Sequence, residues 1–236
     1  NGYTTNFFTG KALEFIDENK NNPFLCYLPY NVPHSPFQVP PEYFDYYRTQ
    51  GLDSTLASVY GMVSNMDHNI GRVIRKLEEE KLTENTILIF LSDNGPNTAR
   101  YNGNMKGRKG SVDEGGIRVP FYIVWPGRIK PGVTDQLAQD IDIFPTLLCF
   151  LGIDYKPANP IDGTDLSGII KGENPSSDRF IFSRQANQPL EICNGSVRND
   201  RYRLVRTQRD TLLYDLLTDP AQKKDISGSE RKILYE

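Results

Sequence analysis

Apolar residues recur along the chain in two patterns, one typical of helices and one typical of buried strands. Helical spacing covers residues 7–19 and 56–77, and a shorter apolar stretch at 143–151 predicts a helix that ends at Gly152. Continuous apolar runs bounded by turn residues or prolines predict buried strands at 24–28, 87–91 and 121–125. Helices that alternate with buried strands predict an α/β fold, in which part of a mostly parallel sheet is flanked by helices.

A different pattern begins near residue 180. Short apolar runs alternate with turn residues and predict a small antiparallel sheet, with strands at 180–182, 191–197, 202–207 and 211–216. The preceding stretch, 153–178, is rich in Pro, Gly, Asp and Asn and indicates a linker or a surface excursion. We therefore expect an α/β domain over residues 1–175 and a small antiparallel β subdomain with a terminal helix over residues 176–236.

Composition narrows the classes of function. The chain has 27 basic and 30 acidic side chains, so we expect no nucleic-acid partner held by bulk charge. No apolar stretch approaches the length that spans a bilayer, so we expect no membrane span. The three cysteines, Cys26, Cys149 and Cys193, include no C-x-x-C pair and predict neither a disulfide framework nor a zinc site. Cys26 and Cys149 lie in apolar runs, and we expect both in the core.

The sequence Ser-Asp-Asn-Gly at 92–95 directly follows the predicted strand at 87–91. Ligands of open α/β sheets bind at the carboxyl ends of the strands, which is where Asp93 and Asn94 are expected. The oxygen atoms of these two side chains suit Ca²⁺ or Mg²⁺. The alternative is a simple Asx turn that Gly95 closes, without a metal.

Five prolines between residues 29 and 41 indicate a long loop after the predicted strand at 24–28. Within this loop, His34 lies between Pro33 and Pro36, which keep the backbone extended and stiff. A histidine held in this way can bind an anion or donate a proton. The alternative is a loop histidine that contacts only solvent.

Two polar residues lie side by side in the sequence on the predicted helix at 56–77. His68 falls on the polar face of this helix and is expected to be solvated. Asp67 falls near the angle of Val63 and Ile74, so we expect a buried carboxylate with hydrogen-bond partners. A structural role is favoured for Asp67 over a role as a metal ligand.

The sequence Lys-Gly-Arg-Lys-Gly at 106–110 places three cations among glycines, which favours an anion-binding loop. It is not a phosphate-binding P-loop, because the required spacing that ends in Lys-Ser or Lys-Thr is missing. The alternative is an exposed basic loop whose side chains are solvated. The sequence Asp-Glu-Gly-Gly follows at 113–116.

Together these segments resemble the sulfatases of the alkaline phosphatase superfamily. Each matching segment is weakly specific alone, but they occur in the family's order over nearly the whole chain. The six matching segments lie at 23–28, 33–36, 86–95, 109–120, 142–148 and 213–220. The resemblance implies that residues 1–175 form the C-terminal part of a sulfatase catalytic domain.

The resemblance also implies roles for four residues. Asp93 and Asn94 match two protein ligands of the family's single Ca²⁺ or Mg²⁺. His34 matches a histidine that contacts the sulfate ester near the leaving-group oxygen, and Lys109 matches the lysine that neutralises the sulfate. A metal ion, a lysine and a histidine would then converge on an anion whose charge shifts during S–O cleavage.

The nucleophile of the family is a formylglycine made from Cys or Ser in a C-x-P-x-R type motif, and this chain contains no such motif. The family's pair of acidic metal ligands and its Gly-Lys-x-His segment are also missing. The chain therefore resembles the C-terminal half of a sulfatase, with the formylglycine expected upstream and the N-terminal half of the same protein as its partner. Alone, it is expected to be inactive, to have little metal affinity, and to oligomerise through exposed apolar surface or an unpaired strand edge.

The implied activity is that of a sulfuric ester hydrolase that cleaves sulfate monoesters of a carbohydrate or aryl substrate. The implied compartment is periplasmic, secreted or lysosomal. By the family pattern, Lys106 and Arg108 are not equivalents of Lys109, and we expect them at the mouth of the pocket. Two alternatives stay open: a phosphatase or phosphonate-monoester hydrolase of the same superfamily, and a non-catalytic protein that binds sulfated glycans.

Overall fold

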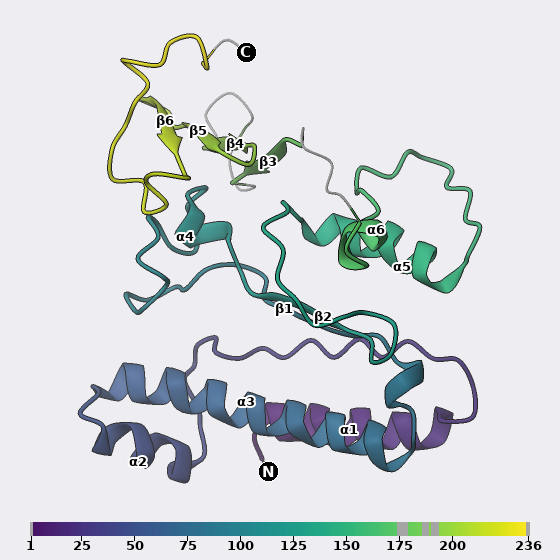
Figure 1. Cartoon of the computed structure of the whole chain (residues 1–236). Helices are drawn as coiled ribbons and strands as arrows, with labels where there is room; N and C mark the ends of the chain where they lie inside the picture. Colours follow the sequence, from purple (N-terminus) through teal and green to yellow (C-terminus); the bar gives the residue numbers. More distant parts are fainter. Residues whose placement is uncertain (1, 174–178, 186–188, 190–193, 235–236) are drawn as a thin grey trace. The chain divides into compact units, whose positions relative to one another are not determined.

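The computed structural model divides the chain into two compact units (Figure 1). The structure describes all residues except 1, 174–178, 186–188, 190–193 and 235–236. The first unit contains Asn1–Ile87 and Trp125–Gly127, and the second contains Leu88–Val124 and Arg128–Glu236. The domain boundary that the sequence predicts between residues 175 and 176 lies outside the described residues.

Three helices build the first unit: α1 (Thr4–Asn19), α2 (Pro41–Thr49) and α3 (Ser54–Glu79). Helix α3 contacts both of the others (Figure 1). Asp53 caps the start of α3, because its side chain accepts a hydrogen bond from the backbone N–H of Leu56 at 2.9 Å. The buried apolar residues of these helices are Ala12, Ile16, Ala57, Val59, Met62 and Leu77. The two long helices that the apolar pattern predicts are therefore confirmed.

Helix α2 lies at the end of the proline-rich segment, where the sequence pattern predicts only a loop. The helix begins with Pro41, whose missing N–H would have no helical partner at that position in any case. Tyr43, Phe44 and Tyr47 are half-buried on one side of α2. The Tyr47 hydroxyl hydrogen-bonds with the Ser64 hydroxyl of α3 at 2.8 Å. Packing against α3 therefore stabilises a short helix that local sequence does not reveal.

The buried face of α3 differs from the one that the sequence pattern predicts. Asp67 is exposed, so its predicted burial is wrong. The two apolar residues that set the predicted angle, Val63 and Ile74, are themselves 38% and 37% exposed. The buried face of α3 follows its contacts with α1 and α2 instead, and includes Asn65 and Asn69. His68 is exposed, as the sequence predicts.

The segment 24–28 does not form a strand, contrary to the sequence prediction. Leu25 and Tyr27 are 81% and 85% exposed, and Cys26 is exposed rather than in the core. A strand needs a neighbour that pairs with its backbone N–H and C=O groups, and no such neighbour exists among the described residues. Cys149 is also exposed, so its predicted place in the core is wrong as well. Cys193 lies outside the described residues.

A two-stranded sheet lies in the second unit, formed by β1 (Leu88–Leu91) and β2 (Phe121–Val124). The two strands are antiparallel, with Leu88 opposite Val124 and Leu91 opposite Phe121. Parallel neighbours need a crossover connection, usually a long helix, and the connection between β1 and β2 contains only the one-turn helix α4 (Glu114–Ile117). The mostly parallel sheet that the sequence predicts is therefore not seen among the described residues.

Buried polar contacts organise the middle of the second unit. The short helices η2 (Asp140–Asp142), α5 (Ile143–Leu151) and α6 (Ser167–Ile170) follow one another along the chain. Gly152 adopts a left-handed conformation with φ of 64° and ends α5, as the sequence predicts. The Leu166 backbone N–H donates to the Thr146 hydroxyl at 2.9 Å. The part of the predicted linker that includes α6 is therefore anchored on α5.

Asp142 is fully buried and has four hydrogen-bond donors around its carboxylate. The guanidinium of Arg179 donates to both oxygens, at 2.7 and 2.6 Å. The backbone N–H groups of Gln139 and Thr164 donate at 2.7 and 2.8 Å. Burial by itself raises the pKa of Asp142. The hydrogen bonds from these donors lower the pKa by more than burial raises it, so that it lies below the usual range of a carboxyl group.

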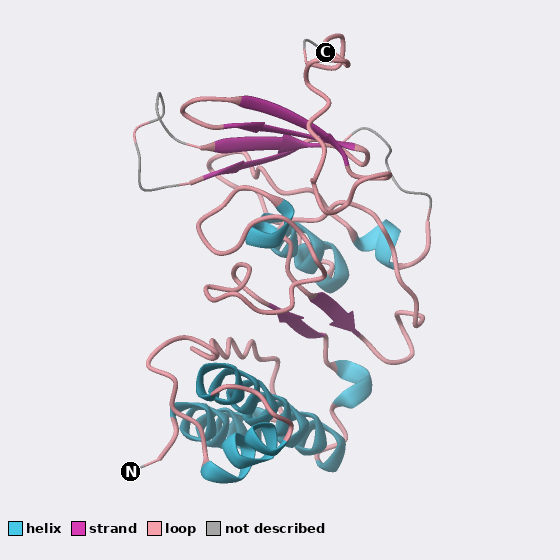
Figure 2. Cartoon of the chain, turned by 90° about the vertical axis from the view of Figure 1, so that its left-hand side faces the viewer, coloured by secondary structure: helices cyan, strands magenta, loops and turns pink. Residues whose placement is uncertain are grey.

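The second sheet confirms the small antiparallel sheet that the sequence predicts near the C-terminus. Its strands are β3 (Ile181–Arg184), β4 (Gly195–Arg198), β5 (Tyr202–Arg206) and β6 (Thr211–Asp215), paired in that order (Figure 2). Val205 and Tyr214 form a small core with Val112 and Leu216. The predicted terminal helix is wrong for the described residues, because the chain forms turns from Leu216 to Leu234. None of the described helices is both long and apolar enough to cross a bilayer.

Candidate active site

The loop after β1 carries the two predicted metal ligands. Asp93 is exposed and Asn94 is half-buried. The backbone N–H of Asn94 donates to Oδ1 of Asp93 at 2.9 Å, and this is the one hydrogen bond that the Asp93 carboxylate makes within the described residues. The other carboxylate oxygen and the Asn94 amide oxygen are therefore available to a ligand that approaches this loop.

Gly95 brings this loop into direct contact with α4. The Gly95 backbone N–H donates to the Gly116 carbonyl oxygen at 2.9 Å. A methyl group on Gly95 would overlap the carbonyl oxygen of Gly115, so this contact requires glycine. The segments that follow β1 and precede β2 are therefore joined backbone to backbone.

The backbone of Lys109 is also hydrogen-bonded to the loop that contains Gly95. Its N–H donates to the Pro96 carbonyl oxygen at 3.0 Å, one residue after Gly95. Gly107 and Gly110 have φ values of 87° and 86°, which let the chain turn sharply on either side of Lys109. The Lys109 side chain is exposed and has no ion-pair partner among the residues that the structure describes. The structure thus brings Asp93, Asn94 and Lys109 onto adjoining loops of one unit.

Lys106 has a different environment from Lys109. Its ammonium donates to the Tyr214 hydroxyl at 2.6 Å and lies 3.5 Å from Oδ1 of Asp113. Burial lowers the pKa of Lys106, but the contacts with Tyr214 and Asp113 raise it above its usual value. Lys106 therefore contacts Tyr214 of the C-terminal sheet and Asp113, and its place at the pocket mouth stays a prediction. Arg108 is exposed, and its place at the pocket mouth stays a prediction.

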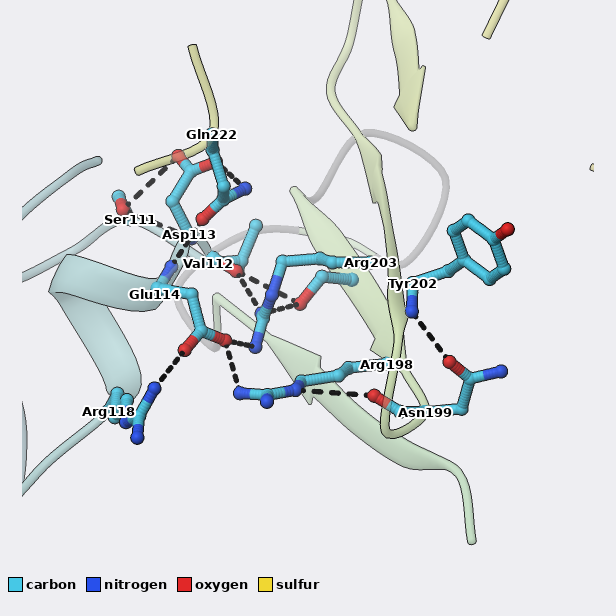
Figure 3. A network of polar contacts seen from close by, with 11 residues as sticks. Ser111, Val112, Asp113, Glu114, Arg118, Arg198, Asn199, Tyr202, Arg203 and Gln222 are labelled. Carbon is cyan, nitrogen blue, oxygen red and sulfur yellow. Dashed lines mark hydrogen bonds and ion pairs between the residues drawn. The ribbon is translucent and has the colours of Figure 1, made fainter. Parts of the chain in front are cut away.

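Glu114 is a buried carboxylate at the start of α4 that sequence reasoning did not single out (Figure 3). It is 2% exposed and accepts hydrogen bonds on Oε1 from Arg203 and, at 2.6 Å, from Arg198. Arg118 lies 3.5 Å from the other carboxylate oxygen. Burial lowers the pKa of Arg203, and the charge of Glu114 opposes that shift. The nearest signal in the sequence is an acidic residue directly before two glycines.

His34 belongs to the other compact unit. Its side chain is exposed, and Nδ1 lies 2.8 Å from the Ser35 carbonyl oxygen. Since a carbonyl oxygen can only accept, Nδ1 carries the proton and Nε2 is left to act on a ligand. That His34 and Lys109 bind the same sulfate group stays a prediction.

The side-chain oxygens of Asp93 and Asn94 are the kind of ligand that Ca²⁺ and Mg²⁺ prefer, but two residues supply too few of them to complete a site. Ca²⁺ takes about six to eight oxygen ligands, and Mg²⁺ takes about six. The described residues contain no group of three or more His, Cys, Asp or Glu side chains that could hold a metal ion. Asp93 and Asn94 can therefore supply part of a metal site, and further ligands must come from elsewhere.

Comparisons with known proteins identify the family to which this chain belongs. The family model for sulfatases matches residues 1–153, and the model for the C-terminal region of N-sulphoglucosamine sulphohydrolase matches residues 108–233. The chain belongs to the sulfatase family. The resemblance that the sequence motifs indicate is therefore confirmed.

Two curated relatives are similar over almost the whole chain. N-acetylgalactosamine-6-O-sulfatase of Bacteroides thetaiotaomicron is 29% identical over 97% of this chain and 48% of its own length. The uncharacterized sulfatase YdeN of Escherichia coli is 33% identical over 100% of this chain and 49% of its own length. The chain thus spans about half the length of these relatives.

A solved structure shows the same fold. The structure of Ps i-CgsB in complex with k-i-k-neocarrahexaose matches with a TM-score of 0.91 and 28% sequence identity. The match covers 99% of this chain and 53% of the neighbour. The helices and small antiparallel sheets described above are therefore arranged as part of a sulfatase fold.

Proposed function

We propose that the protein that carries this chain is a sulfuric ester hydrolase, and that the chain supplies the sulfate-binding part of its active site. The observation that carries this proposal is the pair of backbone hydrogen bonds from Gly95 to Gly116 and from Lys109 to Pro96. Backbone hydrogen bonds join the loop of Lys109, whose side chain is exposed, to the loop that follows Asp93 and Asn94, in a chain of the sulfatase family. An exposed cation beside two oxygen donors suits an anion that is bound partly through a metal ion.

Each residue has a distinct role in this proposal. Lys109 balances the negative charge of the sulfate group. His34 acts as a general acid in its imidazolium form: Nε2 gives its proton to the leaving-group oxygen, and the ring returns to the neutral form with its Nδ1–H still bonded to Ser35. Asp93 and Asn94 would hold a Ca²⁺ or Mg²⁺ ion, which supplies positive charge beside the sulfate when it is bound. The nucleophile, a formylglycine in this proposal, comes from a part of the protein that this sequence does not include.

We propose a sulfated carbohydrate as the substrate. One relative is named for N-acetylgalactosamine 6-O-sulfate chemistry, and a structural neighbour binds a neocarrahexaose. Both matches cover 97% or more of this chain, and this breadth supports the transfer of the substrate class.

A panel of esters tests the proposed reaction. The intact protein is assayed with an aryl sulfate, with N-acetylgalactosamine 6-sulfate, and with an aryl phosphate and an aryl phosphonate monoester. The sulfate esters should have the higher kcat/KM, with release of inorganic sulfate. Preference for the phosphate or phosphonate ester would favour the alternative hydrolases. Calorimetric binding of the sulfated sugar without turnover would favour a non-catalytic glycan-binding protein.

A further inference from the structure

Glu114, Arg198 and Arg203 form a cluster that joins α4 to the C-terminal sheet (Figure 3). We propose that Glu114 is a positioning residue for the anion site: through this cluster, the C-terminal sheet sets the conformation of the loops that carry Lys109 and Asp93. This inference rests on the proposed sulfate-binding role of Lys109.

Glu114 compensates the positive charges of the two arginines in the cluster. Arg198 on β4 and Arg203 on β5 are directly opposite each other in the antiparallel pairing. Like charges in that arrangement destabilise a sheet. Both guanidinium groups donate to the same carboxylate oxygen of Glu114, and the side chains of Glu114 and Arg203 are only 2% and 3% exposed. Each charge is therefore compensated only when α4 is seated on this sheet.

Further contacts fix the residues next to Glu114. The Val112 carbonyl oxygen accepts from Arg203 at 2.8 Å and from the Ser196 hydroxyl at 3.0 Å. The Glu114 backbone N–H donates to the side-chain oxygen of Gln222 at 2.8 Å. The backbone of residues 112–114 is therefore held by side chains from β4, from β5 and from the segment that follows β6.

Three backbone hydrogen bonds connect this anchored segment to the anion site. The Gly115 N–H donates to the Lys106 carbonyl oxygen at 2.7 Å, which fixes the start of the Lys109 loop. The Gly95 N–H donates to Gly116 at 2.9 Å, and the Lys109 N–H donates to Pro96 at 3.0 Å. A shift of Glu114 would therefore change the backbone on both sides of the site.

A merely structural role for the cluster makes a different prediction. In that case, loss of one arginine lowers the free energy of unfolding but leaves the affinity of the folded protein for sulfate unchanged. A positioning role changes the affinity of the folded protein itself.

Arg198→Met in the intact protein separates these roles, because Arg198 is the less buried of the two arginines and Met retains much of its length. The matched control is Arg201→Met. It breaks the exposed ion pair with Asp215 at 2.9 Å, next to the same sheet, without touching α4. We measure KM for an aryl sulfate, the inhibition constant of inorganic sulfate, kcat, and hydrogen exchange at the Gly95 and Lys109 amides.

We expect Arg198→Met to raise KM and the inhibition constant by about tenfold or more, the usual cost of losing a residue that supports a ligand-binding group. Exchange at the Gly95 and Lys109 amides should become faster, whereas Arg201→Met should change none of these values. Arg198→Lys, which keeps the charge, should recover part of the lost affinity. Unchanged sulfate affinity and unchanged exchange in folded Arg198→Met would overturn the inference. An inactive wild-type protein would refute the proposed function instead, and the exchange measurement would then decide the positioning role.

Discussion

Two buried acidic residues, Glu114 and Asp142, show how single side chains hold the second unit together. Each is at most 2% exposed, and each is paired with arginines that are distant in the sequence. Arg198 and Arg203 lie 84 and 89 residues after Glu114. Local sequence motifs therefore indicated Asp93, Asn94 and Lys109 as candidate site residues. They could not reveal that Glu114 is buried, because its arginine partners are distant in the sequence.

The Asp142 pair gives a prediction about stability and pH. Asp142→Asn leaves the partly buried Arg179 guanidinium without its anion and should lower the free energy of unfolding by about 3 kcal/mol at pH 7. The pKa of Asp142 is lowered in the folded state. Its contribution is therefore present above the unfolded-state pKa of about 3.9 and is lost as the pH falls through the lowered folded-state pKa.

Urea unfolding of the wild type and of Asp142→Asn at a series of pH values from 7 down to 2 measures this difference. The gap between the two proteins should be constant near neutral pH and should narrow in acid. A gap that stays constant down to the lowest pH would contradict the assignment to Asp142 ionisation.

Gly95 gives a second prediction at the residue scale. Gly95→Ala places a methyl group on the Gly115 carbonyl oxygen and should destabilise the protein by about 2 kcal/mol. Gly10→Ala is the control, because Gly10 lies in α1 and an added methyl group meets no atom within 4 Å. This control should stabilise the protein by about 0.5 to 1 kcal/mol. Equal effects of the two substitutions in urea unfolding would show that the Gly95 contact is not tight.

At the scale of elements, the sequence predicts helices and hairpins better than isolated strands. Helices α1, α3 and α5 satisfy their hydrogen bonds within one segment, so the apolar pattern alone locates them. The four strands from β3 to β6 pair with their neighbours in the sequence, and turn residues reveal them. The segment 24–28 has a strand-like composition but no strand beside it in the described residues, so its pattern could not decide its structure.

The exposed apolar residues of this segment predict self-association of the isolated 236-residue chain. Leu25 and Tyr27 are 81% and 85% exposed on an extended backbone with no paired strand in the described structure. Light scattering should show oligomers, and the double substitution Leu25→Ser with Tyr27→Ser should shift them toward monomer. Leu217→Ser is the control, since Leu217 is 71% exposed but lies in a turn. A monomeric wild-type chain would contradict this prediction.

At the scale of the whole molecule, the family could be predicted from the order of the motifs, and the family models confirm it. The mostly parallel sheet could not be confirmed, because its expected strands do not pair in parallel within the described residues. The chain spans about half the length of its curated relatives, so the proposed activity belongs to the whole protein. The low metal affinity expected of the isolated chain stays a prediction.

The most direct test of the proposed activity is sulfate release by the intact protein and by its Lys109→Ala variant. Loss of the ammonium group should reduce kcat/KM for a sulfate ester by about a hundredfold or more, as expected for a group that stabilises developing negative charge. Lys130→Ala, which removes another exposed lysine of the same unit, should leave kcat/KM unchanged. No sulfate release by the wild type, or equal release by Lys109→Ala, would contradict the assignment of this chain to the sulfate-binding site.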